Sequence, residues 1–268
     1  MTGGGKTAAT EGAEHAHSGR ELNLKEELAL TAEHLRVRYR NGALGVLDVS
    51  FSVPRNTVVA LFGPNGAGKT TSVRAVSGFM KTEGNRTVAG RVTLLGTDVT
   101  NSEPHETARM GVALVPERRK VFPNMSVVEN LLALGHIPRR SQRANALDQV
   151  FELFPSLTTR RKELAGRLSG GQQQMLAIGR AILGRPKLLI VDEMTLGLHH
   201  SLHAPLFEAI RAIAADGTAV LIVDESTGFA LNVAGYCYLI AGGQVRDEGP
   251  PERFRGNELL AAGYVGGL

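Results

Sequence analysis

The stretch TVVALFGPNGAGKTTSVRAVSGF, residues 57–79, joins an apolar run to a glycine-rich loop and then to a segment with apolar residues at helical spacing. The run predicts a buried strand, and the spacing after the loop predicts a helix. The loop follows the pattern G-x-x-x-x-G-K-[ST], and a position between a strand and a helix is the context that this phosphate-binding motif requires. The stretch therefore predicts an α/β fold with a phosphate-loop core.

The loop residues supply the groups that hold the phosphates of a nucleotide. Glycines let successive backbone N–H groups turn toward one phosphate, and the start of the following helix adds its dipole. Lys69 is expected to reach the β- and γ-phosphates, and Thr70 is expected to place its hydroxyl on Mg²⁺. The candidate phosphate-binding residues are Gly63, Pro64, Asn65, Gly66, Ala67, Gly68, Lys69, Thr70 and Thr71.

Composition limits the classes of protein that the sequence can encode. The 268 residues are 43% hydrophobic, enough to fill the core of one large globular domain or two small ones. The formal charge is +4 and no basic stripe with interleaved aromatics occurs, so no nucleic-acid partner is expected. No apolar run has the length of a membrane-spanning helix. Cys237 is the single cysteine and lies in the apolar run YCYLI, which predicts a small core residue in a reducing, cytosolic setting.

The N-terminal segment differs from the rest of the chain. Residues 1–28 are rich in Gly, Ala, Thr, Glu and His and contain few large apolar side chains, so burial cannot offset the entropy lost on ordering them. We expect a disordered tail. Its GGGKT resembles a phosphate loop, but no apolar strand precedes it and no helical pattern follows it, so no nucleotide site is expected there.

Two apolar strands end in the same Asp-Glu pair. LLIVDE ends at Glu193, and LIVDE ends at Glu225. Each pattern predicts a strand that delivers two carboxylates to a sheet edge, which suits Mg²⁺ and the polarisation of a water. A phosphate-loop ATPase needs one such pair, and both segments qualify locally. Only the first follows closely on RLSGGQQQMLAIGRAILGRP, which predicts a helix that opens at LSGGQ.

Here the sequence resembles the ATP-binding subunit of ABC transporters. The resemblance rests on the phosphate loop, on LSGGQ roughly a hundred residues later and on the apolar strand that then ends in DE, and it covers roughly residues 30 to 250. It implies that Asp192 is the Mg²⁺-associated carboxylate and that Glu193 is the catalytic one, which acts on the water that attacks the γ-phosphate. It also implies that two such domains face each other head to tail. The signature residues that would close on the ATP of the other domain are Ser169, Gly170, Gly171 and Gln172.

The resemblance assigns two further contacts. Tyr39 matches the aromatic residue that stacks on adenine, the alternative being a strand tyrosine on a half-exposed sheet. Glu117 stands where the family usually has a Gln that senses Mg²⁺ and touches the membrane partner; its carboxylate offers an oxygen but adds a negative charge. The surrounding VPERRKVFPNMSVVEN is most similar to the ATPases of branched-chain amino-acid importers, in which Glu is familiar at this position.

The second Asp-Glu pair departs from the family pattern. Glu225 stands at the switch position, where the family has a histidine that contacts the γ-phosphate, and an ionised carboxylate would repel a phosphate oxygen. Three explanations are open: the site hydrolyses ATP slowly, Glu225 turns away or is protonated near ATP, or a different paired subunit supplies the complete site. One ATPase of the importer subfamily commonly lacks that histidine, so we expect a heterodimer with a sister ATPase.

Two histidines follow the first pair. His199 stands where the family often has Asp, and His203 lies one helical turn further on. The two could in principle bind a metal, but no third ligand is identifiable nearby. We expect them to be surface or interface residues.

The resemblance implies an α/β fold: a phosphate-loop NTPase (RecA-like) core with an antiparallel β subdomain and an inserted helical subdomain. We expect residues 29–250 to form this nucleotide-binding domain, with the helical insertion at about 118–175, and residues 251–268 to form a short C-terminal extension. Helical spacing without strand signals in the insertion agrees with this division.

The expected function is ATP binding and hydrolysis that energises a membrane transporter, an importer of branched-chain or other amino acids, with ATP and Mg²⁺ as cofactors. The expected partners are integral-membrane permease subunits, a sister ATPase and, indirectly, a solute-binding protein. They imply a cytoplasmic location, peripheral on the inner face of the cell membrane. Two alternatives are a low-activity nucleotide-binding scaffold subunit of a heterodimeric complex and a non-transport ABC ATPase. The spacing of the motifs, without sustained heptads, disfavours the long coiled-coil arms of the nucleic-acid machines.

Overall fold

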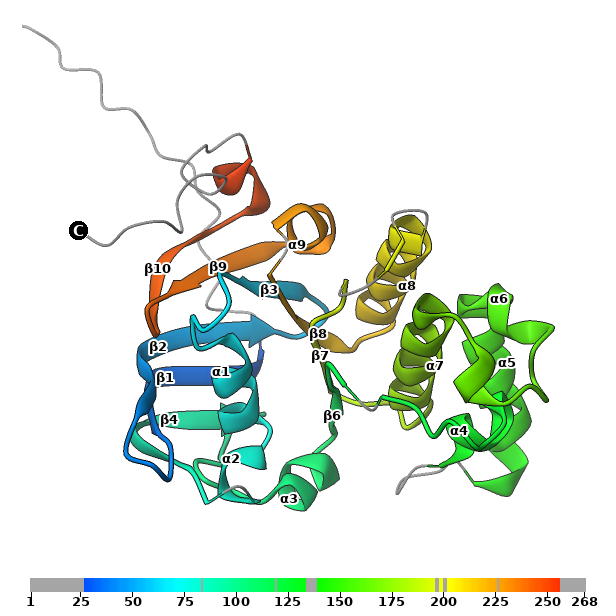
Figure 1. Cartoon of the computed structure of the whole chain (residues 1–268), viewed down its shortest axis with the longest axis horizontal. Helices are drawn as coiled ribbons and strands as arrows, with labels where there is room; N and C mark the ends of the chain where they lie inside the picture. Colours follow the sequence, from blue (N-terminus) through cyan, green and yellow to red (C-terminus); the bar gives the residue numbers. More distant parts are fainter. Residues whose placement is uncertain are drawn as a thin grey trace, which may run out of the picture.

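A computed structural model describes residues 27–82, 84–118, 120–133, 139–195, 198–199, 202–225 and 227–255. Its strands form a sheet of ten in the order β5-β4-β1-β2-β10-β9-β3-β8-β7-β6, with helices on both faces (Figure 1). The strands are β1 (Leu28–Arg38), β2 (Leu44–Pro54), β3 (Val58–Phe62), β4 (Arg86–Leu94), β5 (Thr97–Asp98), β6 (Val112–Val115), β7 (Leu188–Asp192), β8 (Ala219–Asp224), β9 (Tyr236–Ala241) and β10 (Gln244–Gly249). The helices are α1 (Lys69–Val76), α2 (Phe79–Thr82), α3 (Pro104–Arg109), α4 (Val127–Leu132), α5 (Arg143–Leu153), α6 (Pro155–Thr158), α7 (Gly170–Leu183), α8 (His203–Ala215) and α9 (Thr227–Val233), with 3₁₀ turns η1 (Arg140–Gln142), η2 (Ala165–Arg167) and η4 (Pro251–Phe254).

The sheet has an antiparallel part and a parallel part. Strands β5, β4, β1 and β2 pair antiparallel, and buried residues alternate with more exposed ones along much of β1 and β2, as in a sheet with one solvated face. Strands β9, β3, β8, β7 and β6 pair parallel. In β3, β7 and β8 every residue is buried, because a parallel strand is covered on both faces. The expected α/β fold with a phosphate-loop core and an antiparallel β part is confirmed.

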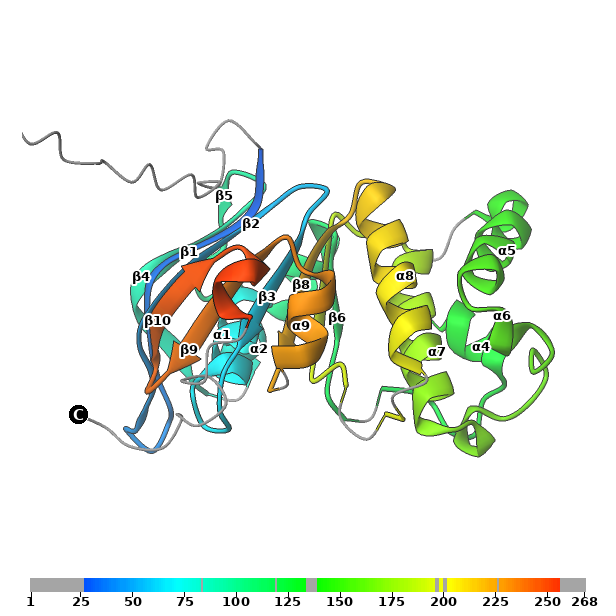
Figure 2. The same ribbon diagram turned by 90° about the horizontal axis from the view of Figure 1, so that it is seen from above.

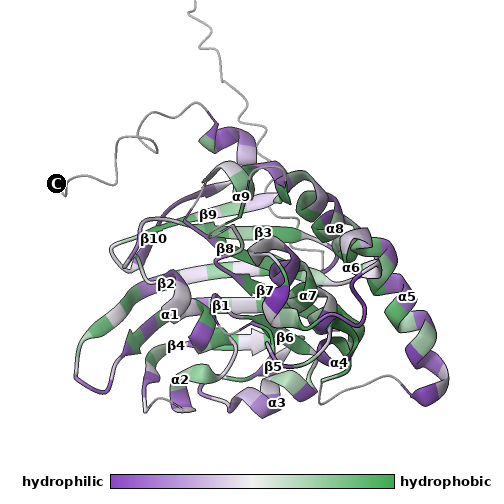
Figure 3. Cartoon of the chain, turned by 45° about the vertical axis from the view of Figure 1, so that its right-hand side comes forward, coloured by the Kyte–Doolittle hydropathy of each residue, from purple (hydrophilic) through white to green (hydrophobic). Residues whose placement is uncertain are grey.

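The central strand β3 separates two hydrophobic cores. Val58, Ala60 and Phe62 join the core under α7, α8 and α9, whereas Val59 and Leu61 join the core under α1. This division follows from the alternation of side chains along a strand. Hydrophobic colour accordingly runs along the central strands in Figure 3.

Helices α4, α5 and α6 lie together on one side of the molecule, and α7 connects them to the sheet (Figures 1 and 2). The apolar side of α7 is buried as the sequence predicts, with Met175, Leu176 and Ile178 inside the core. Helix α5 approaches α7 at Gly179, where a Cβ would lie 2.7 Å from Cγ1 of Val150. A glycine is therefore required for this close packing of the two helices.

The register of three parallel strands fixes the position of the site. Phe62 of β3 pairs with Asp224 of β8, and Asp192 of β7 pairs with Val223. The carboxyl ends of β3, β8 and β7 therefore meet at one edge of the sheet. The phosphate loop, Glu225 and Glu193 follow these three ends directly.

The 3₁₀ turn η4, near the end of the described residues, packs on the core, and the predicted domain boundary at residue 250 stays a prediction. In η4, Phe254 is 3% exposed and packs edge to face on Phe62, with ring centroids 5.1 Å apart. Cys237 is fully buried in the same core, as predicted, and burial raises the pKa of its thiol to about 12. The proposed tail with its GGGKT lies outside the described residues, apart from its last two positions. In the described part of the chain, no helix combines the length and the apolar character needed to cross a bilayer.

Candidate functional site

The phosphate loop wraps around the side chain of Lys69. Lys69 is 4% exposed, and its Nζ donates to the carbonyl oxygens of Gly63 and Pro64 at 2.8 and 3.1 Å. Gly68 has φ +105°, and a Cβ there would lie 2.9 Å from the carbonyl oxygen of Gly45. A side chain would therefore strain the loop where it enters α1. The ammonium group and the first amides of α1 together form a cradle for phosphate.

A cleft of about 330 Å³ opens above this loop. Its lining residues are Tyr39, Leu44, Gly45, Asn65, Gly66, Ala67, Gly68, Lys69, Thr70, Thr71 and Glu193. Tyr39 comes from the end of the β1 segment, and its hydroxyl hydrogen-bonds with Oγ1 of Thr71. The structure therefore brings Tyr39 to the phosphate loop, where its stacking on adenine stays a prediction.

Carboxylates gather at the ends of β6 and β7. Oγ1 of Thr70 donates to Oδ1 of Asp192 at 3.5 Å, which joins the loop to the first Asp-Glu pair. Burial, and secondly the nearby charge of Glu117, raise the pKa of Asp192 to about 6. Burial also raises the pKa of Glu193, while the charge of Lys69 opposes that rise. The cluster therefore carries more negative charge than Lys69 neutralises.

The donor set of this cluster fits Mg²⁺. A hydroxyl and carboxylates are hard oxygen ligands, and Mg²⁺ beside a nucleotide takes only one or two protein carboxylates, the remaining ligands being phosphates and waters. Among the described residues there is no group of three or more His, Cys, Asp and Glu that could hold a metal. Thr70, Asp192 and Glu117 are the residues that would surround the ion.

The backbone at Glu193 is unusual. Its φ is +53°, in the left-handed region, which costs a non-glycine residue about 1–3 kcal/mol. The amide of Glu193 donates to the carbonyl oxygen of Val223 at 2.8 Å. The side chain is half-buried between the buried residues Asp192 and Met194. The turn aims Glu193 into the phosphate-loop cleft, whose wall it forms.

The two residues of the second Asp-Glu pair have different surroundings. Asp224 is 1% exposed and accepts hydrogen bonds from Thr195, the second residue after Glu193. Glu225 is exposed, and its Oε2 accepts a hydrogen bond from Nδ2 of Asn65 in the phosphate loop at 2.9 Å. Glu225 therefore lies over the loop and does not turn away from it in this structure.

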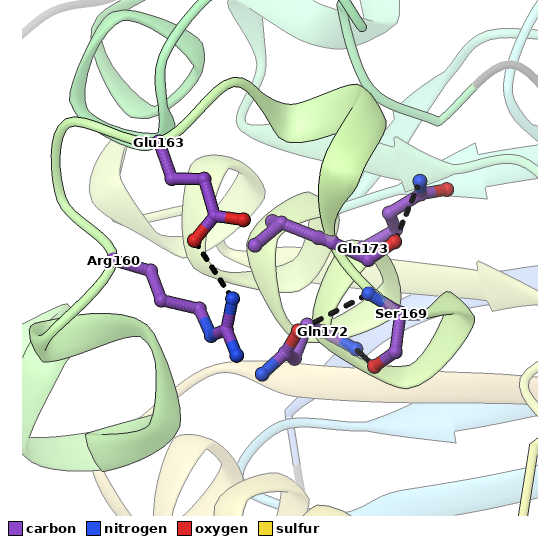
Figure 4. Close-up of polar contacts among 6 residues, drawn as sticks. Arg160, Glu163, Ser169, Gln172 and Gln173 are labelled. Carbon is purple, nitrogen blue, oxygen red and sulfur yellow. Dashed lines mark hydrogen bonds and ion pairs between the residues drawn. The ribbon is translucent and has the colours of Figure 1, made fainter.

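The signature residues form the start of α7 (Figure 4). Oγ of Ser169 accepts from the amide of Gln172 at 3.3 Å, and Oε1 of Gln172 accepts from the amide of Ser169 at 3.1 Å. This capping box holds the helix start in place. Gly171 packs so closely on Leu202 that a Cβ would collide with its Cδ1. None of the described residues that line the phosphate-loop cleft comes from Ser169–Gln172.

Contacts near Glu117 were not predicted from the sequence. Nζ of Lys120 hydrogen-bonds with Oε1 of Gln174, a fully buried residue of α7, and Arg180 of α7 donates to the carbonyl oxygen of Lys120 at 2.6 Å. The only sequence signal for the burial of Gln174, the third residue of QQQ, is its place on the apolar side of the helix. The loop that carries Glu117 is thereby fastened to the signature helix.

Of the two histidines after the first Asp-Glu pair, His203 has ring contacts that show its surroundings. His203 opens α8 and packs against the rings of Phe207 and Phe229, with centroids 6.3 and 5.7 Å away. Its ring therefore packs beside the aromatic residues of the core under α8.

The family model described as ABC transporter matches residues 46–196. The chain belongs to the ABC transporter family. It is 34% identical over 220 residues to the high-affinity branched-chain amino acid transport ATP-binding protein BraG of Pseudomonas aeruginosa, which covers 82% of this chain and 92% of that protein. It is also 31% identical over 240 residues to the lipopolysaccharide export system ATP-binding protein LptB of Haemophilus influenzae, covering 88% of this chain and 97% of that protein.

A solved structure of the family has the same fold. The crystal structure of the ADP conformation of an ATP-binding cassette of an ABC transporter aligns with a TM-score of 0.76 and 28% identity, covering 89% of this chain and 96% of that one. The chain is therefore an ATP-binding ABC transporter subunit and an ATPase whose activity is coupled to transport. The predicted family is confirmed.

Proposed function

We propose that this ABC transporter subunit hydrolyses ATP to drive the import of branched-chain or other amino acids. The observation that supports the substrate class most strongly is the similarity to BraG along nearly all of that protein. The segment with Glu117 in place of the usual Gln agrees with it. LptB is named for lipopolysaccharide export and is almost as similar, so the substrate needs a direct test.

Binding of the nucleotide is assigned to the cleft at the phosphate loop. Lys69 releases its hydrogen bonds to the Gly63 and Pro64 carbonyls and turns its ammonium group to the β- and γ-phosphates. Tyr39 lies at the rim to stack on the base, with a hydroxyl anchored to Thr71. Thr70, Asp192 and Glu117 would hold Mg²⁺, which would supply positive charge to offset the charge of the phosphates.

Glu193 is assigned as the group that orients the attacking water. It lies in the wall of the cleft that holds Lys69, and its pKa is raised by burial, which increases its basicity. The signature residues Ser169–Gln172 lie outside this cleft, so a second ATPase subunit supplies them. One chain therefore holds half of each site.

Glu225 weakens this half of the site. Its carboxylate already accepts from Asn65 at the loop where the γ-phosphate approaches, and it repels that phosphate. A sister ATPase in a heterodimer supplies the more active site. Intact Lys69, Asp192 and Glu193 favour slow hydrolysis here over a purely structural scaffold role.

Replacing Glu225 with Gln is expected to tighten ATP binding about 5-fold, because the repulsion is removed while an oxygen that accepts from Asn65 is kept. ADP affinity is expected to change less, because ADP has no γ-phosphate. Isothermal titration of both nucleotides measures the ratio, and Glu152→Gln on the exposed face of α5 is the matched control. An unchanged ratio of ATP to ADP affinity would show that Glu225 does not act on the γ-phosphate.

Docking on the permease is assigned to a cavity of about 520 Å³ between α3, β6 and α7. Phe122, which is 47% exposed, lies at this cavity with Arg180 stacked over its ring at 5.0 Å. An exposed aromatic beside an apolar hollow suits a partner segment that inserts there. Through this contact the subunit is peripheral to the inner face of the membrane, and a solute-binding protein acts on it only indirectly.

Transport of amino acids is tested by deleting the gene and measuring uptake of radiolabelled leucine, isoleucine and valine. Uptake is expected to fall and to return with the wild-type gene but not with Lys69→Ala. If uptake of all three persists after deletion, the substrate assignment is wrong, whereas the ATPase activity can still be measured on the purified chain.

A further inference from the structure

We infer that Asp224 is a positioning residue for the ATPase reaction: it anchors Thr195 and thereby holds Glu193 in its reactive orientation. The inference rests on the proposed role of Glu193.

The contacts between Asp224 and Thr195 are specific. Oδ2 of Asp224 accepts from the backbone amide of Thr195 at 3.0 Å and from its Oγ1 at 2.8 Å, and Oδ1 lies 3.0 Å from the same hydroxyl. Asp224 is 1% exposed, so its charge is not solvated by bulk water and depends on such partners. Both donor groups of Thr195 are therefore used by one buried carboxylate.

Glu193 lies between two anchors from the same strand. Its own amide donates to Val223 at 2.8 Å, and Thr195, two residues later, is held by Asp224. Between these points the chain passes through the left-handed φ of +53° at Glu193. Strained backbone of this kind persists only where the surroundings fix it from several sides. Loss of the Asp224 anchor therefore frees the turn to relax and moves the Glu193 carboxylate.

The placement of Asp224 favours positioning over a purely structural role. A carboxylate that caps a loop far from the site would stabilise the fold without affecting the reaction. Asp224 instead holds Thr195, which directly follows the buried Met194, and so fixes the backbone just after Glu193. Asp224 is not among the described residues that line the phosphate-loop cleft. Its removal is therefore expected to change the rate of hydrolysis and to leave ATP affinity unchanged.

Four variants test the inference in the purified full chain. Thr195→Val removes the hydroxyl, Thr195→Ser restores it, and Asp224→Asn removes the charge and one acceptor. Thr218→Val is the matched control, because its half-buried Oγ1 donates to the carbonyl oxygen of Pro186 at 3.1 Å, just before the opposite end of β8. Phosphate release is measured under single-turnover conditions with protein in excess over radiolabelled Mg-ATP, and ATP affinity is measured separately.

Phosphate release is expected to slow about 10- to 100-fold in Thr195→Val and Asp224→Asn, at unchanged ATP affinity, while Thr195→Ser and Thr218→Val match the wild type. Equal rates in Thr195→Val, Asp224→Asn and the wild type overturn the inference. A loss of affinity as large as the loss of rate, or an equal slowing in Thr218→Val, also overturns it, because either result indicates general destabilisation.

Hydrogen exchange at the Thr195 amide tests the Asp224 anchor independently of ATP hydrolysis. If the wild type releases no phosphate, the assignment of Glu193 fails. The exchange rate of the Thr195 amide then decides whether Asp224 anchors the turn: faster exchange in Asp224→Asn supports the anchor, and unchanged exchange overturns it.

Discussion

The variant Glu193→Gln is expected to retain bound ATP without converting it to ADP. Glutamine keeps the size and one oxygen of the side chain but cannot act as a base, and removal of a positioned base lowers a rate by about 100-fold or more. The half-buried carboxylate lies in the cleft with Lys69, so the loss falls on the reaction and not on binding. Nucleotide extracted from the protein after incubation with Mg-ATP and separated by chromatography measures the ATP that survives.

The same sample reports on assembly. Unhydrolysed ATP is expected to hold two subunits together through the signature residues Ser169–Gln172. In the presence of the sister subunit, the mass measured by size-exclusion chromatography with light scattering should therefore rise toward that of a dimer. Glu208→Gln, on the exposed face of α8, is the control and should turn ATP into ADP as the wild type does. Conversion of ATP by Glu193→Gln at the wild-type rate would place the catalytic base elsewhere.

The variant Lys69→Ala is expected to lose about 100-fold in ATP affinity. Hydrogen bonds from a charged donor to phosphate contribute about 1.5–3 kcal/mol, and two of them are removed together with the positive charge. Asp192, Glu193 and Glu117 then face the phosphates without the cation that offsets them. Titration of a fluorescent ATP analogue measures the affinity.

The control for this variant is Lys81→Ala. Lys81 is exposed on α2 and pairs with Glu103 at 3.1 Å, so its loss removes a cation without touching the cleft. The melting temperatures of both variants are compared with the wild type, because Lys69 also donates to two loop carbonyls. Wild-type affinity in a folded Lys69→Ala protein would contradict the assignment of the cleft.

Local sequence patterns predicted the elements that carry the chemistry. The buried run before Gly63 forms β3, and LSGGQ opens α7 with the capping box that a Ser followed by Gln at the third position favours. These features depend on neighbours within one helix turn or one strand, so the sequence contains what determines them. The fold class followed from the same patterns.

Contacts across the sheet could not be predicted in this way. The bonds from Thr195 to Asp224 and from Asn65 to Glu225 depend on the order β3-β8-β7 and on its register, which single strands do not encode. The sequence marks Glu225 as a departure from the family pattern but does not indicate its partner Asn65. Asp224 and Asp192 end identical IVDE segments, and only burial and hydrogen bonding in the folded chain distinguish them.

The packing of Phe254 shows the same limit. Phe254 stands in the segment PERFRG, between charged residues, yet its ring packs on Phe62 of the central strand. One aromatic residue in a polar segment gives little local signal, and its burial depends on a strand nearly two hundred residues earlier. Tertiary packing decided this position.

Steady-state phosphate release by the wild-type chain tests the central claim most directly. It is measured at saturating Mg-ATP for the chain alone and for the chain mixed with its sister ATPase, with Lys69→Ala as the background. We predict slow release by the chain alone, above that background, and a marked increase in the mixture. Release that does not exceed the Lys69→Ala background under either condition would contradict the account.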